Sequence, residues 1–234
     1  MSLATRIIPT LLCRGRTLVK GKQFKAWRSV GVAAQAVRIH QARGVDELVL
    51  LDIAATPEGR GPDLALVEEL TAGCFMPLAV GGGVRTVEDV RALLRAGADK
   101  VVIRSASPAL AEAAAAVVGR QGVIAALDYA PGQTSAVTRA REWECAGAGE
   151  ILLTSMDREG MMAGYDLDTL ADVAAAVDIP VIAHGGCGHP SHMLEAIRAG
   201  ASAVAAGSMF LFTDETPRSA ARYLGAAGVE VRTT

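Results

Sequence analysis

The chain contains an internal repeat, and this feature restricts its possible folds more than any other. Residues 44–105 align with residues 147–208 at a constant offset of 103 positions, and about a quarter of the aligned residues are identical. The identities include two glycine pairs, Gly82-Gly83 and Gly185-Gly186, and the tetrapeptide RAGA that follows each pair. Self-similarity at a fixed spacing indicates that one structural unit is built more than once. We therefore expect two related halves.

Each copy of the repeat alternates short apolar runs with segments of helical periodicity. The predicted strands are 6–12, 47–53, 77–82, 100–105, 122–128, 150–156, 180–186 and 203–208. Strands that alternate with helices form parallel sheets, and eight such units fit a closed (β/α)8 barrel, the TIM barrel. We expect one α/β domain, 1–234, with half repeats at about 6–118 and 122–227. An open doubly wound sheet is the alternative, but two similar halves close naturally by a two-fold rotation.

Composition excludes several classes of protein. The 234 residues carry a formal net charge of −2 with both signs interspersed, so neither a nucleic-acid surface nor a polybasic membrane patch is expected. No run approaches the ~20 apolar residues of a membrane span, and the first residues lack the apolar core of a signal peptide. We expect a cytoplasmic protein whose four cysteines, without CxxC spacing, are free thiols.

The two glycine pairs follow the third and seventh predicted strands, at the end of a barrel where active sites lie. Glycine lets backbone N–H groups approach an anion closely, so each half offers a phosphate cradle, although tight turns alone would also explain the glycines. The first cradle comprises Gly82, Gly83, Arg104 and Ser105, and the second comprises Gly185, Gly186, Gly207 and Ser208. Two cradles at one barrel mouth would suit a small molecule phosphorylated at both ends.

Several segments resemble one family closely. They are "RIIP", "DELVLLDI", "PLAVGGGVRTVEDVRALLRAGADKV", "GAGEILLTSMDREG" and "IPVIAHGG", and the similarity runs from Arg6 to Arg232. The family is HisF, the cyclase subunits of imidazole glycerol phosphate synthase. The resemblance implies a half-repeat barrel with two phosphate sites and a HisH-like glutaminase partner, whose ammonia passes through the barrel. The family reaction joins that ammonia to a bisphosphorylated ribulosyl precursor, cleaves it and closes an imidazole ring.

The resemblance also implies roles for single residues at the opposite end of the barrel. Arg6, Glu47, Lys100 and Glu150 stand at the starts of four predicted strands and match a charged ring that gates the entry of ammonia in the family. Without the resemblance, four solvated charges at strand ends would be the simpler interpretation. Asp99 matches a position on the face that binds the glutaminase.

At the mouth, the resemblance implies four site residues. Lys20 matches the lysine of the family's mobile loop, and we expect that loop to span 14–31. Asp52 and Asp157 match acidic positions of the site, with loop capping as the alternative role. Asp128 ends strand five and matches one of two aspartates that act as general acid and base.

The second of those aspartates is absent. Aligning the first strand with the fifth places Leu12 opposite Asp128, and leucine cannot transfer a proton. Cys13 and Arg14 are adjacent, but a neighbouring strand residue points to the other face. The segment after Asp128 is also shorter than the family hairpin, and Arg104 stands where the family usually has asparagine.

These departures leave three functions open. The first is a HisF-like subunit that uses ammonia on a phosphorylated sugar-type substrate, and the second is an authentic cyclase of histidine biosynthesis. The third is a non-catalytic channel that passes ammonia to a third protein, an amidotransferase of amidino-sugar formation. HisF-like proteins from bacterial surface-polysaccharide clusters carry the same leucine and favour the first or the third.

No cofactor or metal ion is expected. His184, Cys187, His189 and His192 lie close together in sequence, but their spacing is not that of a zinc site. Cys187 has no oriented base that would make it a nucleophile.

Overall fold

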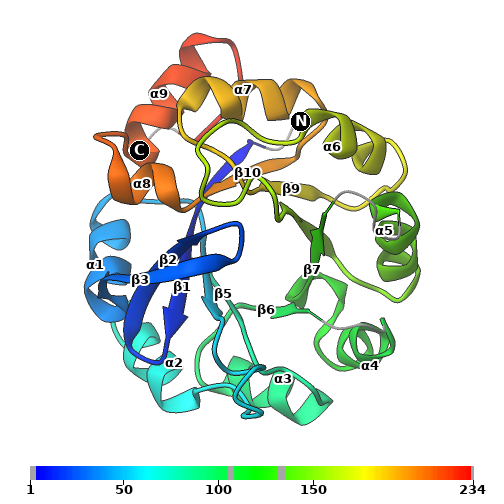
Figure 1. Cartoon of the computed structure of the whole chain (residues 1–234). Coiled ribbons are helices and arrows are strands. Elements are labelled where there is room, and N and C mark those ends of the chain that lie inside the picture. Colours follow the sequence, from blue (N-terminus) through cyan, green and yellow to red (C-terminus); the bar gives the residue numbers. More distant parts are fainter. Residues whose placement is uncertain (1–3, 105–107, 131–134, 233–234) are drawn as a thin grey trace.

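The structure is a computed structural model that describes residues 4–104, 108–130 and 135–232. Eight parallel strands form one continuous sheet in chain order. They are β1 (Arg6–Arg14), β4 (Leu48–Asp52), β5 (Leu78–Gly81), β6 (Lys100–Ile103), β7 (Val123–Tyr129), β8 (Glu150–Ser155), β9 (Val181–His184) and β10 (Ala203–Ala206). Strand β10 pairs with β1, with Arg6 opposite Ala203, so the sheet closes on itself (Figure 1). The predicted (β/α)8 barrel is confirmed, and the open sheet is wrong.

Helices surround the barrel on its outside (Figure 1). They are α1 (Ala33–Ala42), α2 (Leu64–Thr71), α3 (Val87–Arg95), α4 (Ala109–Val118), α5 (Ala136–Cys145), α6 (Leu167–Ala174), α7 (Pro190–Arg198), α8 (Ser208–Phe212) and α9 (Pro217–Ala226), with a short 3-10 turn η1 (Arg120–Gly122). The repeat is visible in their capping. Asp63 accepts a hydrogen bond from the Leu66 N–H at the start of α2, and Asp166 accepts one from the Thr169 N–H at the equivalent start of α6. A capping carboxylate satisfies N–H groups that have no partner within the helix.

The barrel has two apolar layers because both faces of each strand are buried. Val49 of β4 points into the barrel, where it packs with Ile8, Ile124 and Leu152. Leu50, the next residue, points outward into the larger core beneath the helices. Strands that are buried on both faces are continuous apolar runs rather than alternating ones, which explains the pattern in the sequence.

The segment after β1 differs from the prediction. Instead of a loop, residues 15–32 form an antiparallel hairpin of β2 (Thr17–Lys22) and β3 (Lys25–Val32), and Trp27 lies in β3. Lys22 pairs with Lys25 across a two-residue turn, Gln23-Phe24, in which both residues have positive φ angles of 51° and 61°. That geometry matches the type I′ turn of tight hairpins, but glycine or asparagine usually occupies such a turn, so Gln23-Phe24 is not recognisable as a turn from its residue types.

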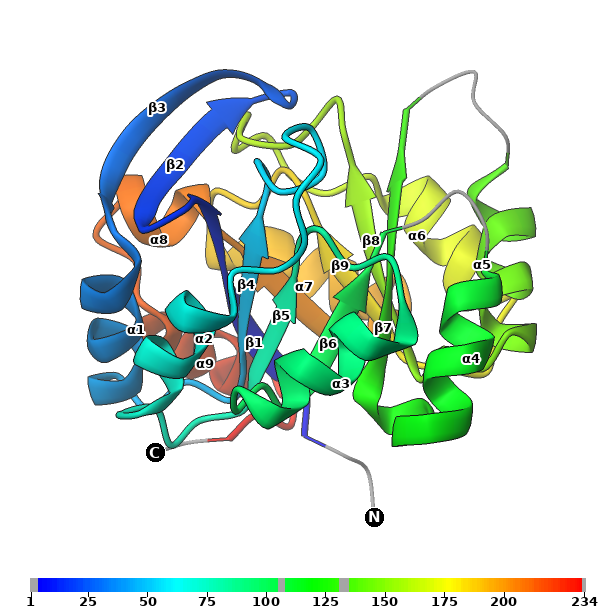
Figure 2. The same cartoon turned by 90° about the horizontal axis from the view of Figure 1, so that it is seen from below.

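This hairpin lies at the end of the barrel to which the parallel strands point (Figure 2). Strand β2 is held to β1 by antiparallel pairing of Cys13 with Leu18. The described C-terminal residues lie at the other end, where Val231 bridges to Thr5. Among the described helices, none is both long and apolar enough to span a bilayer.

Candidate functional site at the barrel mouth

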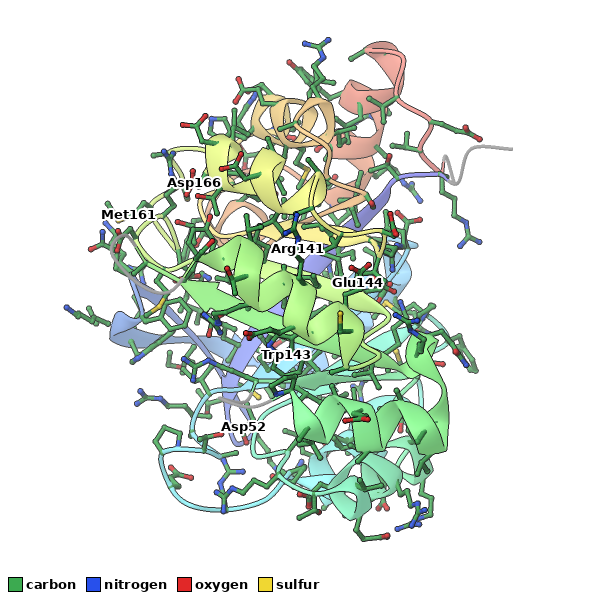
Figure 3. The ribbon with its side chains drawn as sticks, turned by 90° about the vertical axis from the view of Figure 1, so that its right-hand side faces the viewer. Asp52, Arg141, Trp143, Glu144, Met161 and Asp166 are labelled. Atoms are coloured by element: carbon green, nitrogen blue, oxygen red, sulfur yellow. The ribbon has the colours of Figure 1, made fainter. Side chains whose placement is uncertain are left out.

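A cavity of about 410 Å³ opens at the carboxyl ends of the strands. The ends of β1, β4, β6, β7, β8 and β9 and the β2–β3 hairpin all contribute to it. We refer to it as the mouth cavity, and its lining includes Leu12, Asp52, Arg104, Asp128, Glu159 and His184. Figure 3 shows the same end of the barrel from the side, with Met161 and Asp166 toward the mouth and Glu144 toward the opposite end.

Leu12 and Asp128 line the same cavity. Cys13 is fully buried in the outer core, and burial raises the pKa of its thiol to about 12. Arg14, like Leu12, lines the mouth cavity, and its guanidinium lies 5.8 Å from the centre of the Trp27 ring. The expectation that neighbours of Leu12 turn away therefore holds for Cys13 and is wrong for Arg14, because side chains two residues apart on a strand share a face.

Asp128 is paired with a cation. The Nε atom of Arg104 donates a hydrogen bond to Asp128 Oδ2, although the Arg104 side chain is still 63 % exposed. Arg139 donates a second hydrogen bond of 2.8 Å to the backbone oxygen of Asp128. The structure thus places Arg104, predicted as a phosphate ligand, on the carboxylate predicted to act in acid–base chemistry.

The Asp52 carboxylate accepts several hydrogen bonds within the turn after β4. Its Oδ1 accepts hydrogen bonds from the N–H groups of Ala54 at 3.0 Å and Ala55 at 3.3 Å. Its Oδ2 accepts a bond of 2.6 Å from Arg60, a residue that the sequence analysis did not single out. Asp52 caps this loop and also lines the mouth cavity, and its role as an acidic residue of the active site stays a prediction.

Both glycine turns need glycine for reasons of backbone geometry alone. Gly82 and Gly185 have φ angles of 115° and 89°. A Cβ atom on Gly82 would overlap the backbone oxygen of Asp52, and one on Gly185 would lie 2.7 Å from the backbone oxygen of Ser155. Asp52 and Ser155 are themselves equivalent in the repeat. The tight-turn explanation is therefore sufficient for these glycines, and phosphate binding by the two turns stays a prediction.

The second cradle contains polar and charged side chains as well as glycines. Gly185, Gly186, Gly207 and Ser208 line one small pocket together with Lys20 and Glu159. The Oγ atom of Ser208 is buried and has no hydrogen-bond partner among the described residues. In the first cradle, Ser105 lies outside the described residues, so the structure places only Gly82, Gly83 and Arg104.

Lys20 reaches the second cradle from the hairpin. Its Nζ atom pairs with Glu159, and the two residues are only 3 % and 2 % exposed. Asp157, predicted as the acidic residue of this loop, is exposed and does not line the mouth cavity. Glu159 was not predicted as a site residue, although the motif "DREG" contains both acids.

The four residues considered for a metal site have other partners. The Nδ1 atom of His184 lies 3.1 Å from Thr154 Oγ1, and burial and the charge of Lys20 lower the His184 pKa to about 3. His189 accepts a hydrogen bond from the Ser191 N–H at the start of α7, and His192 accepts one from the Gly188 N–H. Burial raises the pKa of the Cys187 thiol to about 11, which argues against a nucleophilic thiolate.

At the opposite end of the barrel, the four residues of the predicted charged ring form a continuous set of ion pairs. Arg6 lies 2.6 Å from both Glu47 and Glu150, and Lys100 lies 3.0 Å from Glu47 and 2.6 Å from Glu150. Burial alone would raise the pKa of Glu150, but hydrogen bonds and charges from Arg6 and Lys100 outweigh it and hold that pKa below its ordinary value. Each carboxylate therefore contacts both cations.

Asp99 lies beside this ring. Its carboxylate accepts a hydrogen bond of 2.8 Å from the Leu78 N–H. It also lines an open groove of about 490 Å³ next to Phe75, whose side chain is 90 % exposed. Phe75 could not be predicted as exposed, because a single phenylalanine before a strand is more often buried than exposed.

Comparisons with known proteins agree on one family. The profile of the family described as "Histidine biosynthesis protein" matches residues 6–216. The imidazole glycerol phosphate synthase subunit HisF of Hyphomonas neptunium is 48 % identical over 250 aligned positions, which cover 99 % of each chain. The similarity therefore includes both ends of the barrel.

Proposed function

The chain belongs to the histidine biosynthesis protein family and is a HisF homologue, and from this premise we propose a specific reaction type for it. The protein is the synthase subunit of a glutamine amidotransferase. It receives ammonia from a glutaminase through the barrel and uses it on a phosphorylated, sugar-type substrate. The reaction differs from the standard formation of imidazole glycerol phosphate.

The route of ammonia is supported by the two ends of the barrel. The charged ring lies at the starts of the strands, and the mouth cavity lies at their ends. Between them, the barrel interior is lined with small and branched apolar side chains such as Ala79, Ala126 and Val102. An apolar interior favours neutral ammonia over the ammonium ion, since burying an unpaired charge is strongly unfavourable.

A phosphorylated substrate is supported by the second cradle. It combines a buried cation on Lys20, a glycine turn with positive φ angles and a hydroxyl on Ser208 that has no partner within residues 4–104, 108–130 and 135–232. Backbone concavities of this kind, together with a lysine, are typical of phosphate sites. The first cradle, with Gly82, Gly83 and Arg104, would take the other end of the substrate.

The environment of Asp128 is the main support for a reaction that differs from the standard one. Cyclisation by general acid–base catalysis requires two proton-transfer groups. Leu12 supplies none, and Asp128 is paired with Arg104. A second candidate, the authentic cyclase of histidine biosynthesis, is favoured by the 48 % identity to the HisF subunit of Hyphomonas neptunium.

One assay separates the two candidates. The purified protein is supplied with an ammonium salt and the bisphosphorylated ribulosyl precursor, and formation of the imidazole product is measured. We compare the wild type with Leu12→Asp and with the double variant Leu12→Asp/Arg104→Asn. Leu12→Asn, which is polar but cannot transfer a proton in the same way, is the matched control.

We expect the wild type and Leu12→Asn to be slower than the double variant by about 10²- to 10⁴-fold, the usual contribution of a positioned acid or base. Wild-type turnover as fast as that of the double variant would establish the authentic cyclase instead. If all four proteins are inactive on the precursor while they bind inorganic phosphate, the mouth is adapted to a different phosphorylated substrate, as proposed.

A further inference from the structure

Lys20 and Glu159 form a buried ion pair between two segments that lie far apart in the sequence. Lys20 belongs to the β2–β3 hairpin, and Glu159 belongs to the loop after β8. Their side chains are 4 % and 3 % exposed. Burial of two charges is unfavourable unless their remaining donors and acceptors are satisfied, and here they are not, because Glu159 Oε2 has no hydrogen-bond partner among the described residues.

The same pair occupies the second cradle. A Cβ atom on Gly207 would lie 3.2 Å from Lys20 Nζ, so the ammonium group faces the backbone of the cradle directly. The buried hydroxyl of Ser208 also has no hydrogen-bond partner in the part of the chain that the structure describes. The space between these groups is only about 10 Å³, which is too small for more than about one water molecule. With the side chains in these positions, the pocket has no room for a phosphate group.

The hairpin is fastened to the Glu159 loop at further points. The Gln23 N–H donates a hydrogen bond of 2.9 Å to the backbone oxygen of Glu159, and the Gln23 side chain donates one of 2.9 Å to the backbone oxygen of Asp157. Gly160 packs so closely on Gly21 that a Cβ atom there would overlap the Gly21 oxygen. Movement of Glu159 away from Lys20 is therefore linked to movement of the hairpin.

The first half of the barrel carries no equivalent carboxylate. The residue that corresponds to Glu159 in the repeat is Thr56. Of the two equivalent positions in the repeat, only the one beside the second cradle therefore carries a carboxylate, and the first half of the barrel serves as a comparison without it.

We infer that Glu159 is a positioning residue that holds Lys20 in the second cradle until a phosphate monoester displaces it. Lys20 then exchanges the carboxylate for the phosphate, Ser208 gains a partner, and the β2–β3 hairpin is released from the Glu159 loop. This inference rests on the proposed phosphorylated substrate and adds to it a competition between substrate and protein at one end only.

The test is a titration with inorganic phosphate, measured by calorimetry and by tryptophan fluorescence. Trp27 lies on the hairpin and reports its movement, whereas Trp143 is a buried residue of α5 that does not line the mouth cavity, and it supplies a constant background. The variants are Glu159→Gln, Glu159→Asp, Lys20→Met and the double variant Lys20→Met/Glu159→Gln. Asp168→Asn is the matched control, because it removes an exposed negative charge from the start of α6.

We expect Glu159→Gln to bind phosphate about tenfold more tightly than the wild type, a factor that corresponds to about 1.4 kcal/mol. Glu159→Asp, whose shorter side chain holds Lys20 less well, should be intermediate, and Asp168→Asn should match the wild type. In the Lys20→Met background, replacing Glu159 should give no gain. The Trp27 emission of phosphate-free Glu159→Gln should resemble that of the phosphate-bound wild type.

Equal phosphate affinity in the wild type and both Glu159 variants would overturn the inference while leaving the proposed phosphate sites intact. Absence of phosphate binding at either cradle in every protein would instead overturn the proposed phosphorylated substrate. If Glu159→Gln does not fold, the comparison between the wild type and Glu159→Asp decides in the same way.

Discussion

Replacing Glu150 by glutamine should destabilise the barrel in a pH-dependent way. In the wild type, Arg6 and Lys100 both lie 2.6 Å from the Glu150 carboxylate. Removing one partner of a fully buried ion pair costs about 3–5 kcal/mol. Arg6 and Lys100 are 26 % and 19 % exposed and keep their contacts with Glu47, so we reduce that figure to about 2 kcal/mol. For a chain of this size, the melting temperature should fall by about 4–8 °C.

The pH dependence follows from the direction of the pKa shift. The pKa of Glu150 is lower in the folded protein than its ordinary value, so its contribution to stability is complete above the unfolded pKa of about 4.3. The contribution is lost as the pH falls through the folded value, where the carboxylate of the wild type becomes protonated. The difference in unfolding free energy between the wild type and Glu150→Gln should therefore be constant at neutral pH and shrink in acid.

The assay is urea unfolding of both proteins between pH 3 and pH 8, with Glu195→Gln as the control. Glu195 is exposed on α7, and its replacement should change the unfolding free energy by less than about 0.5 kcal/mol. The two histidines with lowered pKa values, His40 and His184, affect all three proteins equally and cancel in the differences. A Glu150→Gln effect as small as that of the control, or one that persists undiminished at pH 3, would refute the reasoning.

Three further predictions concern His184 and Gly82, which both line the mouth cavity. The His184 ring should remain neutral between pH 5 and pH 8, because its pKa is about 3; NMR detection of a ring titration near pH 6.5 would contradict the burial of this side chain. Because the unfolded chain binds that proton more readily, His184 should also reduce stability as the pH falls below about 6.5. Gly82→Ala should lower the unfolding free energy by at least about 2 kcal/mol, since the new methyl group overlaps the Asp52 backbone at a φ of 115°, whereas Gly73→Ala, with open space around it, should be tolerated. Equal melting temperatures of the two alanine variants would show that the turn after β5 adjusts.

The fold could be predicted because residues with the same structural role recur at equivalent positions of the two halves. Equivalent aspartates cap α2 and α6, and equivalent glycines adopt positive φ angles after β5 and β9. The hairpin was missed because its turn, Gln23-Phe24, contains neither glycine nor asparagine. A local rule can identify only those turns that use the favoured residues.

Site residues could be predicted where they lie on strands, because alternation sets which side chains face the cavity. They could not be predicted where they lie in loops. Aligning the first strand with the fifth gave Leu12 and Asp128 equivalent positions, and both line the mouth cavity; alternation along the first strand, applied one residue further, would have found Arg14. The choice between Asp157 and Glu159 depends on how the loop after β8 turns, and both acids fit the same motif. Only the structure shows that Glu159 points inward to Lys20.

The charges at the mouth explain why Leu12 and Arg104 belong together. In a site with two facing aspartates, an arginine at position 104 would pair with one of them and remove it from proton transfer. Asp128 lines the cavity together with apolar Leu12, Val102 and Ala126, and an unpaired carboxylate in such surroundings would be poorly solvated. Arg104 satisfies it, and its largely exposed guanidinium still presents donors to the cavity. Under the function that we propose, Leu12 and Arg104 therefore form one consistent change: the mouth has a neutralised carboxylate and an additional cation where the standard reaction needs an acid–base pair, while Arg6, Glu47, Lys100 and Glu150 still form the charged ring.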